Sequence, residues 1–503
     1  MHRWSSRAPL FEAMLAYSQH TMGRFHVPGH KARAAAFGPG ASFYENVLAL
    51  DVTELPGLDD LHHPEEAIEE AQHMAAVCFG AEETWFLVNG STVGNQAMIA
   101  AVCQPGDLLL VQRDVHKSVI HGLMLAGAQA VFIYPRTDTQ SGLRIGVSAE
   151  DVQEALRRYP AAKGLIVTNP TYYGIGTDLK PLAKLLHDQD KLLLVDEAHG
   201  AHYGWHPRLP QSAMACGADA AVQSTHKMLT ALTMSSMLHV QGPRINRTAL
   251  RRILGMLQSS SPSYLLMASL DLGRQYLQEQ GTQALDEGLA MLDSWNVRLA
   301  ARPRWGSARP SNAEYRMDPF KSVLYDTEGV LDGYRLKAEL ERYGCYPEMA
   351  DADRVVLAFS LASTLEDSER LIEALDRIEE QHPIPISTRR IESSRVANEC
   401  AAAAGMPMKL WVSEPVPFGI GSIHDDDKST IAIPLDECEG YTAAEMIVPY
   451  PPGIPVLYPG ERITADTVAD LRRLATAGAK FQGHNVTERG TVPVRLPHLE
   501  NRD

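Results

Sequence analysis

Regular alternation of apolar strand candidates with amphipathic helices over residues 84–223 is the feature that most constrains this chain. Short apolar runs recur there, each followed by a polar cluster and then by a helical pattern. Strands that alternate with helices predict an α/β fold, with a mostly parallel sheet covered by helices on both faces. Ligands of such sheets bind beyond the carboxyl ends of the strands, so we expect the polar clusters to form one site.

The apolar runs place the strands, and amphipathic spacing places the helices between them. The expected strands are residues 84–88, 107–111, 129–134, 164–168, 191–195 and 219–223. The expected helices are residues 93–103, 115–126, 149–159 and 181–188. Asp196 and Ser224 directly follow the last two strands, which is where a ligand would lie.

The segments around this core indicate further parts of the chain. Residues 1–20 suit a short amphipathic helix, whereas residues 21–64 are rich in Gly, Pro and His and indicate an ordered loop. Residues 245–300 have a helical pattern. Beyond them, a smaller α/β domain is predicted, with strands at 322–325 and 354–358 and helices at 333–343 and 365–381.

The stretch His382-Pro383-Ile384-Pro385 indicates a linker before a separate C-terminal domain. We therefore expect four parts: an N-terminal helical arm at 1–20, a large domain at 21–270, a small α/β domain at 271–385 and a C-terminal α+β domain at 386–503.

Charge and composition exclude several classes of protein. The chain has 46 Lys+Arg against 62 Asp+Glu, a net charge of −16, which argues against a nucleic-acid or anionic-membrane partner. It has no apolar run long enough to span a membrane, and its N-terminus lacks the apolar core of a signal peptide. The 6 cysteines are too scattered for a disulfide scaffold, so we expect reduced thiols in a cytoplasmic protein.

Two motif matches are weakened by their context. Asp196-Glu197-Ala198-His199 spells a helicase box, but the chain has no Gly-Lys dipeptide for a phosphate loop, so nucleotide hydrolysis is not expected. No Gly-x-Gly-x-x-Gly follows a strand either. His199, His202 and His206 lie in a Gly-rich loop without a recognised set of ligands, so we predict no metal.

The segment Ser224-Thr225-His226-Lys227 is more informative. Taken alone, Lys227 fits a solvated lysine at the start of a helix, and Asp196 fits a helix cap. Together they suggest pyridoxal phosphate (PLP), which needs a lysine for its Schiff base and a carboxylate at its ring nitrogen. Gly90-Ser91-Thr92, between a strand and a helix, could bind the phosphate.

With these and further motifs, the chain resembles the Orn/Lys/Arg decarboxylase family of fold-type-I, aspartate aminotransferase-like PLP enzymes. The motifs that carry the resemblance run in the family's order from about residue 25 to residue 465. They are Phe25-His26-Val27-Pro28-Gly29-His30-Lys31, Leu58-Asp59-Asp60-Leu61-His62, Asn89-Gly90-Ser91-Thr92, Arg113-Asp114-Val115-His116-Lys117-Ser118, Asn169-Pro170-Thr171-Tyr172-Tyr173-Gly174, Asp196-Glu197-Ala198-His199-Gly200, Ser224-Thr225-His226-Lys227 and Pro449-Tyr450-Pro451-Pro452-Gly453-Ile454-Pro455.

The resemblance implies a role for each matched residue. Lys227 would form the Schiff base, Asp196 would pair with the ring nitrogen, and His116 would stack on the ring. Ser91, Thr92 and Ser224 would donate to the phosphate, although most of the family has Gly-Thr-Ser where this chain has Gly90-Ser91-Thr92. Ala198 would pack beneath the ring, and His199 and His226 would lie near the substrate, with Lys227 or His226 as the proton donor to Cα.

The family acts on basic amino acids, whose buried charge requires a carboxylate. Glu437 falls where lysine decarboxylases of the family carry an acidic residue, and Asp59 and Asp60 are further candidates, with Glu445 less favoured. The resemblance is closer to the short Gram-positive form, because no receiver-like wing domain is expected before residue 25. It therefore implies decarboxylation of arginine to agmatine in polyamine biosynthesis, with lysine or ornithine as alternative substrates.

Two rival functions use the same residues. The first is another PLP reaction, an aminotransferase or a lyase, and the second is a non-catalytic protein that binds PLP. The C-terminal Pro-Pro-Gly segment favours the decarboxylase, and the presence of Lys227, Asp196 and His116 together argues against a non-catalytic protein. The fold family further implies a homodimer, or a multiple of dimers, because its site lies between two subunits.

Overall fold

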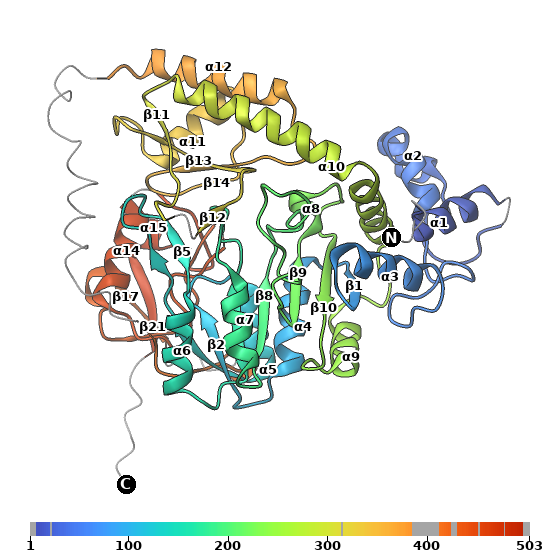
Figure 1. Ribbon diagram of the computed structural model, residues 1–503, viewed down its shortest axis with the longest axis horizontal. Coiled ribbons are helices and arrows are strands. Elements are labelled where there is room, and N and C mark those ends of the chain that lie inside the picture. Colours follow the sequence, from blue (N-terminus) through green and yellow to red (C-terminus); the bar gives the residue numbers. More distant parts are fainter. Residues whose placement is uncertain are drawn as a thin grey trace, which may run out of the picture. The chain divides into compact units, whose positions relative to one another are not determined.

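The computed structural model describes residues 7–20, 23–312, 315–384, 412–423, 430–450, 453–476 and 478–495. Its helices and strands confirm the α/β class expected from the sequence (Figure 1). The chain divides into two compact units. The first comprises Met1–Val102, Leu179–Glu287 and Ser360–Ala362, and the second comprises Cys103–Asp178, Gly288–Phe359 and Ser363–Asp503.

Four strands of the first unit are ordered β1 (Glu83–Leu87), β10 (Ser236–Val240), β9 (Ala220–Gln223) and β8 (Leu192–Asp196). β8 and β9 run parallel, whereas β10 is antiparallel to both of its neighbours. The expected strands at 84–88, 191–195 and 219–223 are confirmed. β10 was not expected, because only a single helical turn precedes it and the strand–helix alternation therefore does not reveal it.

The helices of the first unit include α4 (Gly90–Val102), α7 (Leu179–His187), α8 (Thr225–Met228) and α9 (Arg247–Leu257). α4 packs closely on the strands because Gly94 has no side chain. A methyl group at Gly94 would come within 2.4 Å of Val222 Cγ2 and 2.8 Å of Leu87 Cδ1. This close approach brings the N-terminus of α4 towards the carboxyl end of β9.

The N-terminal segment contains α1 (Pro9–Gln19), η1 (Ala34–Gly40), α2 (Ala41–Leu50) and α3 (Ala67–Phe79). The helix expected within residues 1–20 is confirmed by α1. The ordered loop expected over residues 21–64 is wrong for residues 34–50, which are helical. Gly38, whose backbone angles are not helical, and Pro39 interrupt η1, and only Leu48 of α2 is buried, so the sequence carries little of the apolar periodicity that marks a helix.

Strands of the second unit include β6 (Gly164–Thr168), β2 (Leu108–Gln112), β3 (Gln129–Ile133) and β16 (Val416–Pro417), in that order. β2 is parallel to both β6 and β3, as the alternation predicted, and β16 adds an antiparallel edge. The associated helices are α5 (Lys117–Ala126) and α6 (Ala149–Arg158). Four short strands complete this part: β4 (Arg136–Thr137), β5 (Arg144–Gly146), β7 (Ile175–Gly176) and β12 (Arg316–Met317).

A second sheet of this unit is antiparallel throughout. Its order is β11 (Trp305–Ser307), β13 (Lys321–Asp326), β15 (Val355–Ala358) and β14 (Met349–Ala350). The two strands expected here are β13 and β15, and the two helices are α11 (Gly333–Arg342) and α12 (Leu365–Gln381). The helical pattern of residues 245–300 corresponds to α9 and to the long α10 (Tyr264–Ala300).

The C-terminal part has a core of its own. β17 (Thr430–Pro434), β21 (Thr491–Arg495) and β18 (Thr442–Ala443) form a sheet whose buried side chains pack with those of α14 (Ala465–Thr476) and α15 (Val486–Arg489). Its remaining elements are η2 (Ile420–Ile423), η4 (Leu435–Glu437), β19 (Val448–Pro449) and β20 (Phe481–Gln482). The expected linker at 382–385 falls partly outside the described residues, since only His382, Pro383 and Ile384 belong to them.

Over the described ranges, no helix combines the length and the apolar character that a membrane crossing requires.

Candidate functional site

Asp196 ends β8, and its carboxylate is buried at the carboxyl edge of the first unit's strands. Asn95 Nδ2 donates to Asp196 Oδ2 at 2.8 Å, and the Ala198 amide donates to Oδ1 at 3.2 Å. Burial raises the pKa of Asp196, and the Asn95 hydrogen bond and the Lys227 charge offset this only in part. Asp196 is therefore a buried carboxylate within electrostatic reach of a lysine.

Lys227 lies in α8, a single helical turn directly after β9. Its Nζ is 3.1 Å from His199 Nε2, which accepts from the ammonium because a charged lysine can only donate. The next residue back, His226, donates from Nδ1 to the Ser235 carbonyl at 2.9 Å. Burial lowers the pKa of His226 and favours the neutral ring. Two imidazoles thus flank the lysine, and only His199 has a hydrogen bond to it.

The hydroxyl groups expected at the phosphate lie together in the first unit. Ser224 Oγ donates to Ser91 Oγ at 2.8 Å, and Ser91 lies in the first turn of α4. Thr92 is exposed one residue further along the same turn. Thr225 Oγ1 is buried and finds no hydrogen-bond partner in the described part of the chain, so a donor remains here for an added acceptor.

These side chains fit pyridoxal phosphate. The amine of Lys227 can bind the aldehyde, and the buried carboxylate of Asp196 suits a protonated ring nitrogen. Two serine hydroxyls at the N-terminus of α4 suit a phosphate, because a helix N-terminus presents free amides and a positive dipole end. Ala198 is buried next to Asp196, as expected for a residue beneath the ring. The first unit therefore supplies an amine, a buried carboxylate and hydroxyl donors, which are the three groups that the cofactor needs.

His116, for which the family resemblance predicts ring stacking, belongs to the second unit and caps α5. Its Nδ1 accepts from the Ser118 amide at 3.2 Å and lies 2.9 Å from Ser118 Oγ. Its Nε2 faces Gly453, where an added methyl group would lie 3.4 Å from Nε2 and 3.6 Å from Tyr450 Cδ2. The structure thus fixes His116 between its own helix and the C-terminal segment.

Asp59 has a local structural role. Its carboxylate accepts hydrogen bonds from five backbone amides that precede or begin α3: those of Asp60, Glu65, Glu66, Ile68 and Glu69. Partial burial works to raise the pKa of Asp59, but these hydrogen bonds outweigh it and hold the pKa below its ordinary value. Asp60 accepts one amide, that of His62, at 2.8 Å.

The other acidic candidates are exposed. Glu437 ends η4 in the C-terminal part, and among the described residues its carboxylate makes no hydrogen bond or ion pair. Glu445 is likewise exposed. Within the described part of the chain, no contact brings either residue to the side chains around His116, and their role at a substrate stays a prediction.

The structure points to an acidic residue that sequence reasoning missed, Glu348, which is exposed like Glu437 and Glu445 but has a tyrosine partner. Its Oε1 accepts from Tyr172 Oη at 2.5 Å. Burial, followed by the Glu348 charge, raises the pKa of Tyr172, and the hydroxyl of Tyr450 also acts on it electrostatically. Tyr450 lies against Gly453, which faces His116. The only sequence signal was the Tyr172-Tyr173 pair, because nothing around Glu348 distinguishes it from a surface glutamate.

Glu197, the neighbour of Asp196, is structural. It accepts from Gln223 Nε2 at 2.8 Å and from the Ala213 amide at 2.7 Å, and burial raises its pKa to about 8. Of the three loop histidines, His206 is held by Asp286 at 3.1 Å. No set of three His, Cys, Asp or Glu side chains within the described segments is arranged to bind a metal.

Comparisons with known proteins agree with this chemistry. Residues 8–300 match the family model described as "Orn/Lys/Arg decarboxylase, major domain", and residues 426–494 match "Orn/Lys/Arg decarboxylase, C-terminal domain". The first match alone covers more than half of the chain.

Relatives match over nearly the whole length. The chain is 39% identical to YaaO of Bacillus subtilis, covering 95% of this chain and 96% of that protein. It is 36% identical to an arginine decarboxylase of Halalkalibacterium halodurans, covering 95% of each chain. Among solved structures, the Francisella novicida lysine decarboxylase LdcF superposes with a TM-score of 0.80 at 22% identity, covering 97% of this chain and 81% of that one. This last likeness shows the fold.

Proposed function

The chain belongs to the Orn/Lys/Arg decarboxylase family, and we propose that it decarboxylates L-arginine to agmatine with PLP held by Lys227. The observation that carries the proposal is the combination of Lys227, Asp196 and the paired serines at one strand edge with full-length relatives named arginine decarboxylase. The same proposal assigns the reaction to polyamine biosynthesis in the cytoplasm.

PLP, when bound, accepts the electron pair that departing CO2 leaves on Cα. The residues of the chain make this possible. Asp196 would keep a proton on the ring nitrogen, because its charge has little solvent to screen it. Lys227 would hold the cofactor and then, once free, carry a proton to Cα. His199, 3.1 Å from Lys227 Nζ, can exchange that proton with it.

His226 is less suited to be the proton donor, although the sequence left it equal to Lys227. Its Nδ1–H is committed to the Ser235 carbonyl, and its lowered pKa leaves Nε2 without a proton near neutral pH. A neutral ring in this tautomer accepts a proton and does not give one. The geometry therefore favours Lys227, assisted by His199.

The distal cation of the substrate needs a carboxylate. We propose Glu348 for this contact, because Tyr172 orients it and Tyr450 links the pair to Gly453 and His116 within one unit. A guanidinium can bind such a carboxylate through two parallel hydrogen bonds, whereas an ammonium binds as a point charge. Lysine and ornithine are the alternative substrates.

The proposal includes a homodimer. The segment 23–50 of the first unit exposes large apolar side chains, among them Phe25 at 98%, Phe43 at 83% and Val27 at 64%. Large apolar side chains exposed in one segment indicate an interaction surface, and a second copy of this chain is the occupant that the family implies. Phe43→Asp should shift the mass in light scattering from dimer to monomer, and an unaltered mass would argue against this surface.

The test is CO2 release by the holoenzyme from L-arginine, L-lysine and L-ornithine. Arginine should have the highest kcat/KM, and Lys227→Ala should abolish both CO2 release and covalent cofactor attachment. Borohydride reduction followed by peptide mapping should identify Lys227. Release of CO2 from none of the three amino acids would contradict the proposed function. Transfer of the amino group to a keto acid, with no agmatine formed, would favour the aminotransferase rival.

A further inference from the structure

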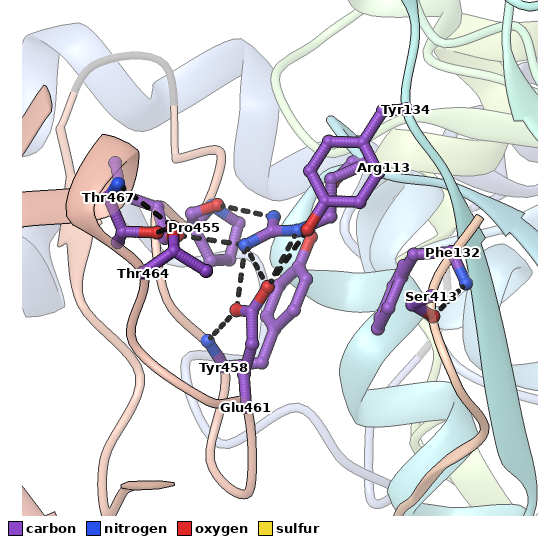
Figure 2. A network of polar contacts seen from close by, with 10 residues as sticks. Arg113, Phe132, Tyr134, Ser413, Pro455, Tyr458, Glu461, Thr464 and Thr467 are labelled. Carbon is purple, nitrogen blue, oxygen red and sulfur yellow. Dashed lines mark hydrogen bonds and ion pairs between the residues drawn. The ribbon is translucent and has the colours of Figure 1, made fainter. Parts of the chain in front are cut away.

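Arg113, three residues before His116, has an unusually complete set of partners. Its Nη2 donates to Glu461 Oε2 at 2.8 Å and its Nε donates to Glu461 Oε1 at 3.2 Å, in a fork (Figure 2). The same guanidinium donates to the carbonyl groups of Pro455 at 3.0 Å and Val456 at 2.8 Å. Arg113 therefore binds a loop more than 340 residues away along the sequence.

Aromatic rings enclose this ion pair. The guanidinium carbon lies 4.0 Å from the ring centre of Tyr458 and 5.5 Å from that of Phe132. Tyr458 Oη donates to the Arg113 carbonyl at 2.7 Å, and the Tyr458 amide donates to Glu461 Oε2 at 3.0 Å. We call Arg113, Tyr458, Glu461 and the carbonyl groups of Pro455 and Val456 the Arg113 clamp.

The loop held by the clamp contacts His116. The Lys117 amide donates to the Gly453 carbonyl at 3.3 Å, and Lys117 Nζ donates to Gln482 Oε1 at 2.7 Å. Gly453 has a φ of +87° and presents only its Cα to His116 Nε2. The backbone at Gly453 thus lies against the imidazole, two and three residues before the carbonyl groups that Arg113 binds.

We propose that the Arg113 clamp positions His116, so that the C-terminal segment 453–461 supports the residue to which the family resemblance assigns ring stacking. The proposal rests on the proposed function, because it takes His116 to be the residue that stacks on the ring. Arg113, Glu461 and Gly453 touch neither substrate nor cofactor in this account, and they act through His116 as positioning residues.

The chemistry of the clamp suits this task. A buried guanidinium that donates in several fixed directions holds both the strand end and the loop, whereas a lysine in its place would bind as a single point. A stacking ring must keep its position to within about 0.5 Å, so a small shift of Gly453 would affect cofactor binding through His116.

The first experiment compares Gly453→Ala with Gly440→Ala. Both glycines have nearly the same positive φ, +87° and +86°, so the backbone strain of the two substitutions is matched. Only at Gly453 would the new methyl group contact His116, since nothing lies within 4 Å of the methyl at Gly440. Gly453→Ala should weaken PLP binding to the apoprotein about fivefold or more and shift the visible absorbance of bound cofactor. Gly440→Ala should change only thermal unfolding.

The second experiment tests whether the effect passes through His116. Arg113→Lys, which keeps the charge but loses the fork, is measured alone and in a His116→Ala background. PLP affinity should fall about fivefold in the first case and hardly at all in the second, because the ring to be positioned is absent. Arg113→Lys also serves if Gly453→Ala does not fold.

Additive effects of Arg113→Lys and His116→Ala on PLP affinity would overturn the proposal, as would equal effects of the two glycine variants. PLP affinity is measured on the apoprotein without substrate. The result therefore stands apart from the proposed function, which fails only if the unmutated enzyme releases no CO2 from basic amino acids.

Discussion

The buried charges around Asp196 and those of the Arg113 clamp differ in how completely they are paired. Asp196 accepts two hydrogen bonds, and burial leaves its pKa raised. Glu461 accepts the Arg113 fork and the Tyr458 amide, and Arg113 also binds two carbonyl groups. Asp196 is buried and Glu461 is partly buried, so the more deeply buried carboxylate is the less completely paired one.

This difference in pairing indicates the role of each region. A charge that the protein pairs completely gives rigidity, because every partner is already in place without a ligand. A charge that it leaves partly paired retains free energy that a ligand can recover. Asp196, with two hydrogen bonds and a raised pKa, is of the second kind, and the clamp beside His116 is of the first.

Removal of Glu461 should give the largest effect on stability. Glu461→Ala leaves the guanidinium of Arg113 buried without its carboxylate, which should lower the free energy of unfolding by about 3 kcal/mol. The matched control is Asp436→Ala, which breaks the exposed Arg472–Asp436 ion pair and should cost less than about 1 kcal/mol. Urea unfolding of the apoproteins measures both, and equal losses would show that the clamp is no more than a surface pair.

Asp196→Asn, in contrast to Glu461→Ala, should affect catalysis more than stability. Loss of the charge at the ring nitrogen should lower kcat about 100-fold, while Lys227 still attaches the cofactor. Because the pKa of Asp196 is raised above 3.8, the folded apoprotein holds this proton more tightly than the unfolded chain. Stability therefore falls as pH rises through the folded pKa, and Asp196→Asn should remove that part of the decline. A kcat equal to that of the unmutated enzyme would contradict the role of Asp196.

The sequence predicted the Asp196 region more fully than the clamp, for a physical reason. Parallel strands end at one edge, so Asp196, Ser224 and Lys227 could be brought together from the strand pattern alone. Ser91 followed from the same rule, at the start of the helix after residue 88. Each of these residues lies within a few positions of a strand end, and local periodicity was sufficient.

The residues that sequence reasoning missed depend on contacts between distant segments. Arg113 was noted only as part of a motif, because its partner Glu461 lies in a different segment that has no periodicity to place it. Glu348 directly precedes β14 of the small antiparallel sheet, whose register no local pattern reveals. The helix α2 was missed because its aromatic side chains remain exposed, so the usual apolar stripe is absent.

Glu348→Gln tests whether this carboxylate binds the distal cation of the substrate. The amide keeps the size of the side chain but loses the charge, so KM for arginine should rise roughly tenfold, equivalent to about 1.4 kcal/mol, with little change in cofactor absorbance. Glu437→Gln is the matched variant, because the sequence favoured that residue. A tenfold rise for Glu437→Gln alone would support the sequence-based assignment against the geometric one.

Asp59→Asn should give the smallest effect, and it separates a capping carboxylate from one that binds substrate. Its five amide contacts should make the substitution cost about 1 kcal/mol of unfolding free energy at neutral pH, while Asp60→Asn, with one contact, should cost less. The pKa of Asp59 is lowered below 3.8, so its contribution is present above that pH and is lost as pH falls through the folded pKa. The gap in stability between the unmutated protein and Asp59→Asn should therefore close below about pH 4, as measured by urea unfolding. A stability difference between the two proteins that stays constant with pH would show that the carboxylate charge does not cap α3. A rise in KM without loss of stability would instead place Asp59 at the substrate.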